Sequence, residues 1–190
     1  MSSSPLNDIL RYRRERLPMA LVLSVAALLT VAATAVSGRV SAADVFRNMV
    51  LAGSLVIQFR LWDDLNDIDH DRINHPDRVL CRLESHSHFR FVLAILFAIN
   101  SVALSLLKSP QTATVFIVLN IVFLLWYRVL REYFPAFLHV HVVLTKYPVF
   151  AFLIADEPTA KNKTSIVLMM VVVYGGACIY EYLHNRHARK

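Results

Sequence analysis

Long stretches without a charged residue constrain most strongly what this chain can fold into. They cover residues 17–38, 91–107, 109–127 and 164–180, and residues 133–155 carry Lys146 as their one charge. An α-helix needs about 20 largely apolar residues to cross the hydrocarbon core of a bilayer, and about 17 suffice. A composition that is 56% hydrophobic over 190 residues is also more apolar than soluble domains usually are. We therefore expect an integral membrane protein.

The spacing of these stretches predicts an all-α bundle of about six spans in a single membrane domain, residues 1–190. Residues 42–62 form the weakest candidate, because Asp44, Arg47 and Arg60 interrupt them. Pro135 and Pro148 lie inside the expected fifth span and predict kinks. We expect a basic segment over residues 1–16, followed by spans near 17–38, 42–62, 89–107, 110–128, 134–155 and 164–183.

The lysines and arginines predict the orientation of these spans. With six spans both termini face the same side, and that side carries 14 of the 20 basic residues, whereas the other carries five. Cytoplasmic loops are enriched in Lys and Arg, so we expect both termini, and the loop after the second span, in the cytoplasm. The net charge of +6 is then a topology signal with some affinity for anionic lipid headgroups. A nucleic-acid partner is not expected, because no soluble basic domain is present to bind it.

Six of the nine aspartates lie between Asp63 and Asp77, directly after the second expected span. At about 100° per residue, Asp64, Asp67 and Asp71 share one helix face within roughly 60°, with Arg60 one turn earlier. Pro76 is expected to end the helix that carries them. Such carboxylates repel one another unless cations screen them, and Mg²⁺ prefers carboxylate oxygen and bridges to phosphates. The sequence favours a magnesium site over a merely solvated acidic helix end, since ionisable groups at membrane depth usually mark function.

The aspartate segment, Asp63-Asp64-x-x-Asp67-x-x-x-Asp71 with the continuation Arg72-Ile-Asn74-His75-Pro76-Asp77-Arg78, resembles the first aspartate-rich motif of the UbiA superfamily of intramembrane prenyltransferases. Asp63 stands where that family usually has Asn, and His75 where Arg is common. Tyr127-x-x-x-Arg131 is similar to the family's Tyr-x-x-x-Lys element, although Arg131 could equally be a positive anchor at the membrane surface. Glu181-x-x-x-Asn185 stands where the family has a second D-x-x-x-D motif. Family members usually have nine helices, so this chain looks like a shortened member.

The resemblance implies transfer of a prenyl group from a prenyl diphosphate to an aromatic or lipid acceptor inside the membrane, with Mg²⁺ as cofactor. Lys146 could instead form a structural pair with a carboxylate. A second copy of the chain could supply the wall that the missing helices leave open, and rings such as Phe116, Phe123, Trp126, Phe137 and Phe150 could line the path of the prenyl tail. The implied catalytic residues are Asp64, Asp67, Asp71 and Arg131, the diphosphate-binding residues are Arg60, Arg78, Tyr127 and Lys146, and the metal ligands are Asp63, Asp64, Asp67, Asp71, Glu181 and Asn185.

Two alternatives stay open, and one class is excluded. A shortened relative with a degenerate second motif could be a non-catalytic partner or scaffold in lipid metabolism. A membrane di-iron enzyme is less favoured: Glu181-x-x-His184 has the ligand spacing of di-iron bundles, but the paired-histidine boxes are absent. Transferases of the CDP-alcohol type need a glycine in their aspartate motif, and this chain has no glycine between Gly53 and Gly175.

Overall fold

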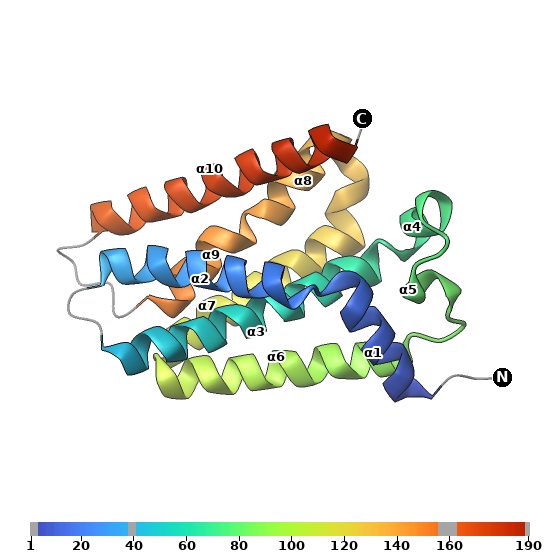
Figure 1. Ribbon diagram of the computed structural model, residues 1–190. Coiled ribbons are helices and arrows are strands. Elements are labelled where there is room, and N and C mark those ends of the chain that lie inside the picture. The colour runs from blue at the N-terminus through green and yellow to red at the C-terminus, as the bar shows by residue number, and fades with distance from the viewer. Residues whose placement is uncertain (1–3, 38–40, 156–162, 189–190) are drawn as a thin grey trace.

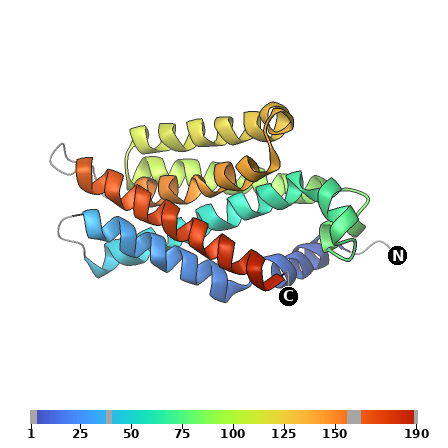
Figure 2. The same cartoon turned by 90° about the horizontal axis from the view of Figure 1, so that it is seen from above.

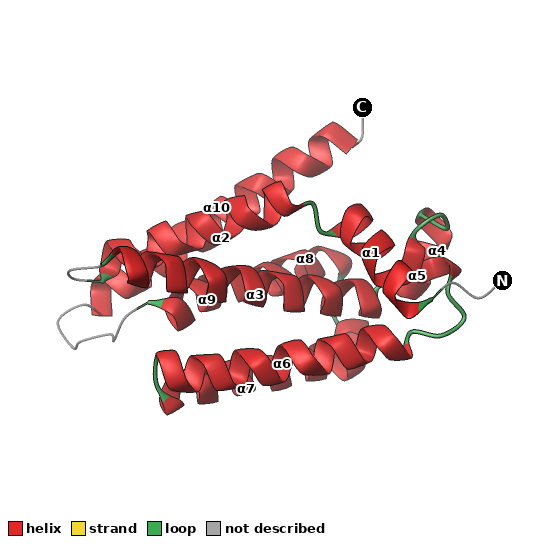
Figure 3. Ribbon diagram, turned by 60° about the horizontal axis from the view of Figure 1, so that its bottom comes forward, coloured by secondary structure: helices red, strands yellow, loops and turns green. Residues whose placement is uncertain are grey.

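Helices form every regular element of the part of the chain that this computed structural model describes, residues 4–37, 41–155 and 163–188 (Figures 1 and 3). The all-α prediction is therefore confirmed over these residues. In chain order the elements are α1 Pro5–Arg16, α2 Met19–Val36, α3 Ala42–Asn66, α4 Ile68–Asn74, α5 Val79–Arg82, α6 Ser87–Leu107, α7 Pro110–Leu125, a π-helical turn Trp126–Leu130, a 3₁₀ turn Arg131–Tyr133, α8 Ala136–Leu144, α9 Lys146–Ile154 and α10 Lys163–Ala188.

Five helical segments among the described residues are long and apolar enough to cross a membrane, which makes the chain an integral membrane protein. They are Met19–Val36, Ser87–Leu107, Pro110–Tyr133, Phe137–Ile154 and Lys163–Leu183. They correspond to five of the six predicted spans. The remaining one, 42–62, does form a helix, and α3 even extends beyond it to Asn66. Its charged residues keep it outside the group of apolar spans.

Serine and proline residues explain where several helices begin. Ser4 and Ser109 each accept a hydrogen bond from a backbone N–H in the first turn, and a proline follows each of them. Proline suits this position because the first N–H groups of a helix have no intrahelical partner. At Ser41 the side chain accepts from the N–H of Asp44, while the Asp44 carboxylate accepts from the N–H of Ser41. This reciprocal pair fixes the start of α3.

The predicted fifth span is two helices rather than one. Helix α8 ends at Leu144 and α9 begins at Lys146, with Thr145 between them. Pro148 has no N–H to donate to the carbonyl of Leu144, so the helical hydrogen bonding is interrupted here, and the kink predicted at Pro148 is confirmed. The kink predicted at Pro135 is wrong, because Pro135 precedes α8 instead of lying inside it.

Helix α7 does not end as a regular α-helix. A wider turn follows it, in which the N–H of Arg131 donates to the carbonyl of Trp126, five residues earlier. The chain stays helical to Tyr133, which is beyond the end expected near residue 128. This π-helical turn carries Tyr127 and leads directly to Arg131, and both residues face the aspartates described below.

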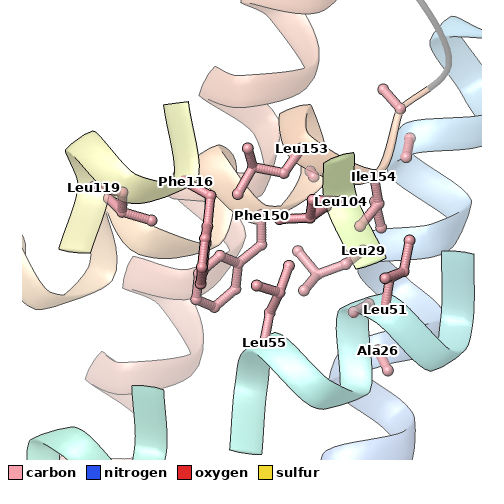
Figure 4. Close-up of a cluster of buried hydrophobic side chains, with 14 of the residues drawn as sticks. Ala26, Leu29, Leu51, Leu55, Leu104, Phe116, Leu119, Phe150, Leu153 and Ile154 are labelled. Carbon is pink, nitrogen blue, oxygen red and sulfur yellow. The ribbon is translucent and has the colours of Figure 1, made fainter. Parts of the chain in front are cut away.

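The core of the bundle forms around α3, which packs on α2, α6 and α9. Buried side chains from all four helices and from α7 meet there, among them Leu29, Leu55, Phe116 and Phe150 (Figure 4). Phe59 is fully buried, and its ring centroid lies 5.3 Å from that of Phe123 and 5.0 Å from that of Phe150. Helix α10 lies on the outside of this bundle against α9 and α2 (Figure 2).

A second, smaller cluster closes one end of the bundle. Tyr12 of α1, Leu61 of α3, Leu80 of α5 and Phe89 of α6 are buried together there. Helix α1 turns away from the direction of α2 and lies across this end of the bundle, beside α5 (Figure 1). We call it the aspartate end, because α3 delivers Asp63 and Asp64 to it.

Candidate functional site

The aspartates lie at the end of α3 and in the short helix that follows. Asp63 and Asp64 are buried in the last turn of α3, and Asp71 is buried in α4. The helix predicted to carry all of them up to Pro76 is interrupted at Asp67, which separates α3 from α4. The prediction of one continuous stripe made by Asp64, Asp67 and Asp71 is therefore wrong, and the three carboxylates reach different partners.

Asp63 is held by two residues from the second half of the chain. The Tyr127 hydroxyl donates to its Oδ1 at 2.5 Å, and the Lys146 ammonium forms a short ion pair with its Oδ2. Lys146 is the first residue of α9 and is itself buried. Of the two roles considered for Lys146, the structure shows the ion pair with a carboxylate.

Asp64 is held by helix α1. The Tyr12 hydroxyl donates to Asp64 Oδ2 at 2.9 Å, and the Arg16 guanidinium makes a two-pronged contact, Nε to Oδ2 at 3.1 Å and Nη2 to Oδ1 at 2.5 Å. Arg60, one turn earlier on α3, adds a longer contact of 3.5 Å. Tyr12 and Arg16 are four residues apart on α1, so both project from the same face toward Asp64.

Burial and the neighbouring charges determine the ionisation of Tyr12 and Arg16 at this contact. Burial, together with the Asp64 charge, raises the pKa of Tyr12, so its hydroxyl stays protonated and keeps donating. Burial opposes the charged form of Arg16, but its hydrogen bond to Asp64 and the Asp64 charge outweigh this and raise the pKa of Arg16. The bond between α1 and Asp64 therefore joins a permanent cation to its carboxylate.

Asp67 and Asp71 each pair with an arginine. Arg131 Nη1 lies 2.5 Å from Asp67 Oδ1, and the Arg131 guanidinium also lies over the Tyr127 ring, 5.9 Å from its centroid. Arg78, in the turn before α5, forms a short ion pair with Asp71. Arg131, predicted to be catalytic, and the four residues predicted to bind diphosphate all lie against the predicted acidic residues. The four are Arg60, Arg78, Tyr127 and Lys146.

The charges of this site nearly cancel. Four carboxylates, those of Asp63, Asp64, Asp67 and Asp71, face five cations, Arg16, Arg60, Arg78, Arg131 and Lys146. Among the side chains that the structure describes, which end at residue 183, no three acidic, histidine or cysteine side chains are grouped closely enough to hold a metal ion. The oxygen donors suit Mg²⁺, but their arrangement does not: each carboxylate is directed at its own cation, and the ion pairs would have to open.

The second motif lies elsewhere. Glu181 belongs to the last turns of α10, and in Figure 1 that end of α10 lies apart from the end of α3. The side chain of Asn185 lies outside the described residues. Glu181 accordingly belongs to no metal-sized group of ligands in the described part of the chain.

An apolar groove lies between α3, α6 and α7. Its volume is about 320 Å³, and Trp62, the residue before Asp63, lines it together with Arg90, Phe97, Ile117 and Leu124. Ligand pockets usually occupy about 300–1,000 Å³. The Arg90 side chain is exposed and has no hydrogen bond or ion pair among the described residues. The groove thus joins an apolar surface to a free cation.

Three buried amide side chains form a chain of hydrogen bonds behind this groove. Asn100 Nδ2 donates to Gln58 Oε1 at 2.7 Å, Gln58 Nε2 donates to Asn120 Oδ1 at 2.9 Å, and Asn120 Nδ2 donates to the carbonyl of Phe116 at 2.7 Å. Gln58 and Asn120 also line the groove. Sequence reasoning missed these amides, as it missed Tyr12 and Arg16. Their signal was an amide in the middle of each of three otherwise largely apolar spans, which is a mark of helix-to-helix contact in membranes.

The aromatic residues expected along a prenyl tail fall into two groups. Phe116, Phe123, Trp126 and Phe150 are buried in helix packing, whereas Phe137 is exposed. Ordinary core packing therefore accounts for four of the five.

No protein-family model matches this chain, and neither the curated proteins nor the solved structures contain a significant match to it.

Proposed function

We propose that this membrane protein binds the diphosphate of a prenyl lipid at its aspartate end and transfers the prenyl group to an aromatic or lipid acceptor, as UbiA-type enzymes do. One observation carries the proposal: cations from separate segments, among them Arg78, Arg131 and Lys146, meet at a buried group of carboxylates where α3 ends. Ionisable residues at such a position are expensive in a membrane and usually serve a function. The Lys and Arg distribution favours a cytoplasmic location for this end.

The apolar groove supports a lipid substrate. A prenyl chain lying along Phe97 and Ile117 would bring its head to Trp62 and Arg90. The Trp62 ring centroid lies 6.4 Å from that of Tyr127, whose hydroxyl donates to Asp63. Arg90 has no acidic partner among the described residues and offers a guanidinium that suits phosphate oxygens. Chain and head would thus be bound by adjoining surfaces of different chemistry.

Substrate binding would have to exchange partners at the aspartates. A diphosphate could take Arg131 from Asp67 and Arg78 from Asp71, because an arginine forms paired hydrogen bonds with phosphate as readily as with carboxylate. These two guanidinium groups would then neutralise the negative charge that grows on the diphosphate as its bond to the prenyl carbon breaks. Mg²⁺ remains a prediction from the sequence. Phosphate binding and charge neutralisation, as described here, are roles of Arg78 and Arg131 themselves.

The test is geranylgeranyl diphosphate binding and diphosphate release by detergent-solubilised protein, with Mg²⁺ and a membrane lipid extract as acceptor source. We expect Arg131→Gln to lower the rate of release by about 100-fold, the size of effect seen when a residue that stabilises developing charge is removed. Arg72→Gln is the matched control, because Arg72 is 51% exposed and pairs with Asp69 at the surface. It should retain the wild-type rate.

A non-catalytic membrane partner is the second candidate, and the pairing of each carboxylate with its own cation favours it. A bound substrate is not needed to neutralise this site, because internal ion pairs already do so. Wild-type protein that neither binds geranylgeranyl diphosphate nor releases diphosphate in the presence of Mg²⁺ would decide for this candidate.

A further inference from the structure

Helix α1 presents two chemically different faces. Asp8, Tyr12 and Arg16 repeat every four residues and lie on the side packed against the protein, where Tyr12 and Arg16 hold Asp64. The opposite side carries Leu6 and Leu10, which are 65% and 40% exposed. Arg13 and Arg14 lie on either side of this leucine pair at about 100° per residue.

The outward arginines have no partner. The side chains of Arg11, Arg13 and Arg14 are exposed and make no hydrogen bond or ion pair with any described residue. The cations that face the aspartates differ in this respect, since each of them pairs with a carboxylate. Three unpaired arginines beside exposed leucines are the composition of a helix that lies in the membrane interface, where leucines enter the acyl region and arginines reach phosphates.

A hollow beside α1 could receive the headgroup. It has a volume of about 730 Å³ and lies between α1 and the α5 region, with Arg11 and Arg14 in its wall. Three acidic residues share this wall, and each has a contact: Asp77 pairs with Arg82 at 2.6 Å, Glu15 accepts a hydrogen bond from the Val79 N–H at 3.0 Å, and Asp8 Oδ2 lies 3.9 Å from His88 Nε2. The guanidinium groups of Arg11 and Arg14, by contrast, have no ion pair with any described residue.

We propose that α1 is a binding site for anionic phospholipid, with the phosphate held by Arg11 and Arg14 and the acyl chains lying against Leu6 and Leu10. Anionic lipids are concentrated in the cytoplasmic leaflet, to which the Lys and Arg distribution assigns this end of the protein. Because the opposite face of the same helix holds Asp64, bound lipid fixes Tyr12 and Arg16 on that carboxylate. This inference does not depend on the prenyl-transfer proposal.

The experiment is amide hydrogen exchange of residues 5–16 in the full chain, in nanodiscs of phosphatidylcholine alone or mixed with phosphatidylglycerol. Exchange should slow as phosphatidylglycerol is added, and high salt should abolish the slowing. Each arginine at a membrane surface raises the affinity for anionic lipid about fivefold, so the Arg11→Gln/Arg14→Gln variant should bind anionic lipid about 25-fold more weakly than wild type. Arg72→Gln/Arg128→Gln removes the same charge from exposed positions at the same end and should respond like wild type.

The proposal would be overturned if exchange in α1 were the same in both kinds of nanodisc. It would also be overturned if the Arg11/Arg14 variant still responded to phosphatidylglycerol while its α2 and α3 were protected as in wild type. Equal loss of the response in the control variant would indicate a general charge effect and would overturn it as well. Inorganic phosphate added to phosphatidylcholine nanodiscs separates the two sources of phosphate. If it slowed exchange as phosphatidylglycerol does, the site would bind a soluble anion instead of a lipid.

Discussion

Helices α3 and α10, the two longest in the described part of the chain, have opposite relations between sequence and environment. Helix α3 carries charged and amide residues along its 25 residues, yet it occupies the centre of the bundle and buries Asn48, Gln58, Asp63 and Asp64. Helix α10 is apolar over most of its 26 residues, yet side chains such as Val171 and Val172 are more than half exposed. In a bilayer, the apolar side chains of α10 can face lipid on the outside of the bundle, whereas the polar side chains of α3 find their partners among protein residues inside it.

The contrast explains why hydropathy alone ranks α3 last among the candidate spans. A polar side chain facing lipid would lack hydrogen-bond partners, whereas inside the bundle Gln58 and Asp63 find them. Polar residues in an otherwise apolar helix therefore mark the side that faces other helices. Three pairs of substitutions, each of which compares an interaction of α3 with a position on α10, test this difference.

The largest effect is expected from breaking the ion pair of Asp63. Lys146→Met leaves a buried carboxylate without its cation, and removal of one partner of a buried pair usually costs about 3–5 kcal/mol of unfolding free energy. Lys163→Met is the matched change at the exposed start of α10 and should stay within about 0.5 kcal/mol of wild type. Unfolding in SDS titrations, followed by circular dichroism, measures both.

The double variant Asp63→Asn/Lys146→Met controls for lost packing. It should be more stable than Lys146→Met alone, because the unpaired charge is gone. If both proteins unfold at the same SDS fraction, the ion pair does not hold α9 to α3.

A second comparison uses one substitution in both helices. Leu55 is fully buried in α3, and Leu55→Ala should cost about 2 kcal/mol, the low end for core leucines. The low end applies because lipid is as apolar as the core, so lost packing and the cavity make up the cost. Leu168 of α10 is 62% exposed, and Leu168→Ala should change stability by less than about 0.5 kcal/mol. Equal losses in SDS titrations would contradict the assigned faces.

The smallest effect is expected from hydrogen bonds. Gln58→Leu removes the central member of the amide chain and should cost about 1–2 kcal/mol, because Asn100 and Asn120 both lose a partner. Tyr174→Phe in α10 removes an exposed bond to His141 Nδ1 at 2.9 Å, and should cost about 0.6 kcal/mol, the average for hydrogen bonds between membrane helices. If Tyr174→Phe cost more stability than Gln58→Leu, the amide chain would not be formed in the bilayer.

Features encoded locally could be predicted from the sequence. The uncharged stretches locate five apolar spans, Pro148 explains the break at Thr145, and the aspartate segment does end α3. The failures concern contacts between distant residues. Asp64 meets Tyr12 and Arg16, which lie 52 and 48 positions away, and nothing in the local pattern indicates that α1 lies across the bundle end.

The same limit applies to the aspartates. Periodicity predicts which carboxylates share a face only while the helix continues, and the interruption at Asp67 ends that reasoning. The competition between a metal ion and a neighbouring arginine for each carboxylate is likewise decided by three-dimensional proximity, as Arg131 shows for Asp67.

The π-helical turn Trp126–Leu130 makes the length of the chain at that point matter as much as its composition. A turn of this kind accommodates one extra residue relative to an α-helix. Because the wider turn absorbs the extra residue, deleting one residue there would restore regular winding and keep everything downstream in phase, whereas inserting a further residue that no second wide turn absorbs would rotate it by about 100°. After such an insertion Arg131 would leave Asp67 with its side chain chemically intact. The contact between Arg131 and Asp67 thus depends on the phase of the helix, and an insertion could disrupt it without changing the identity of a single charged residue.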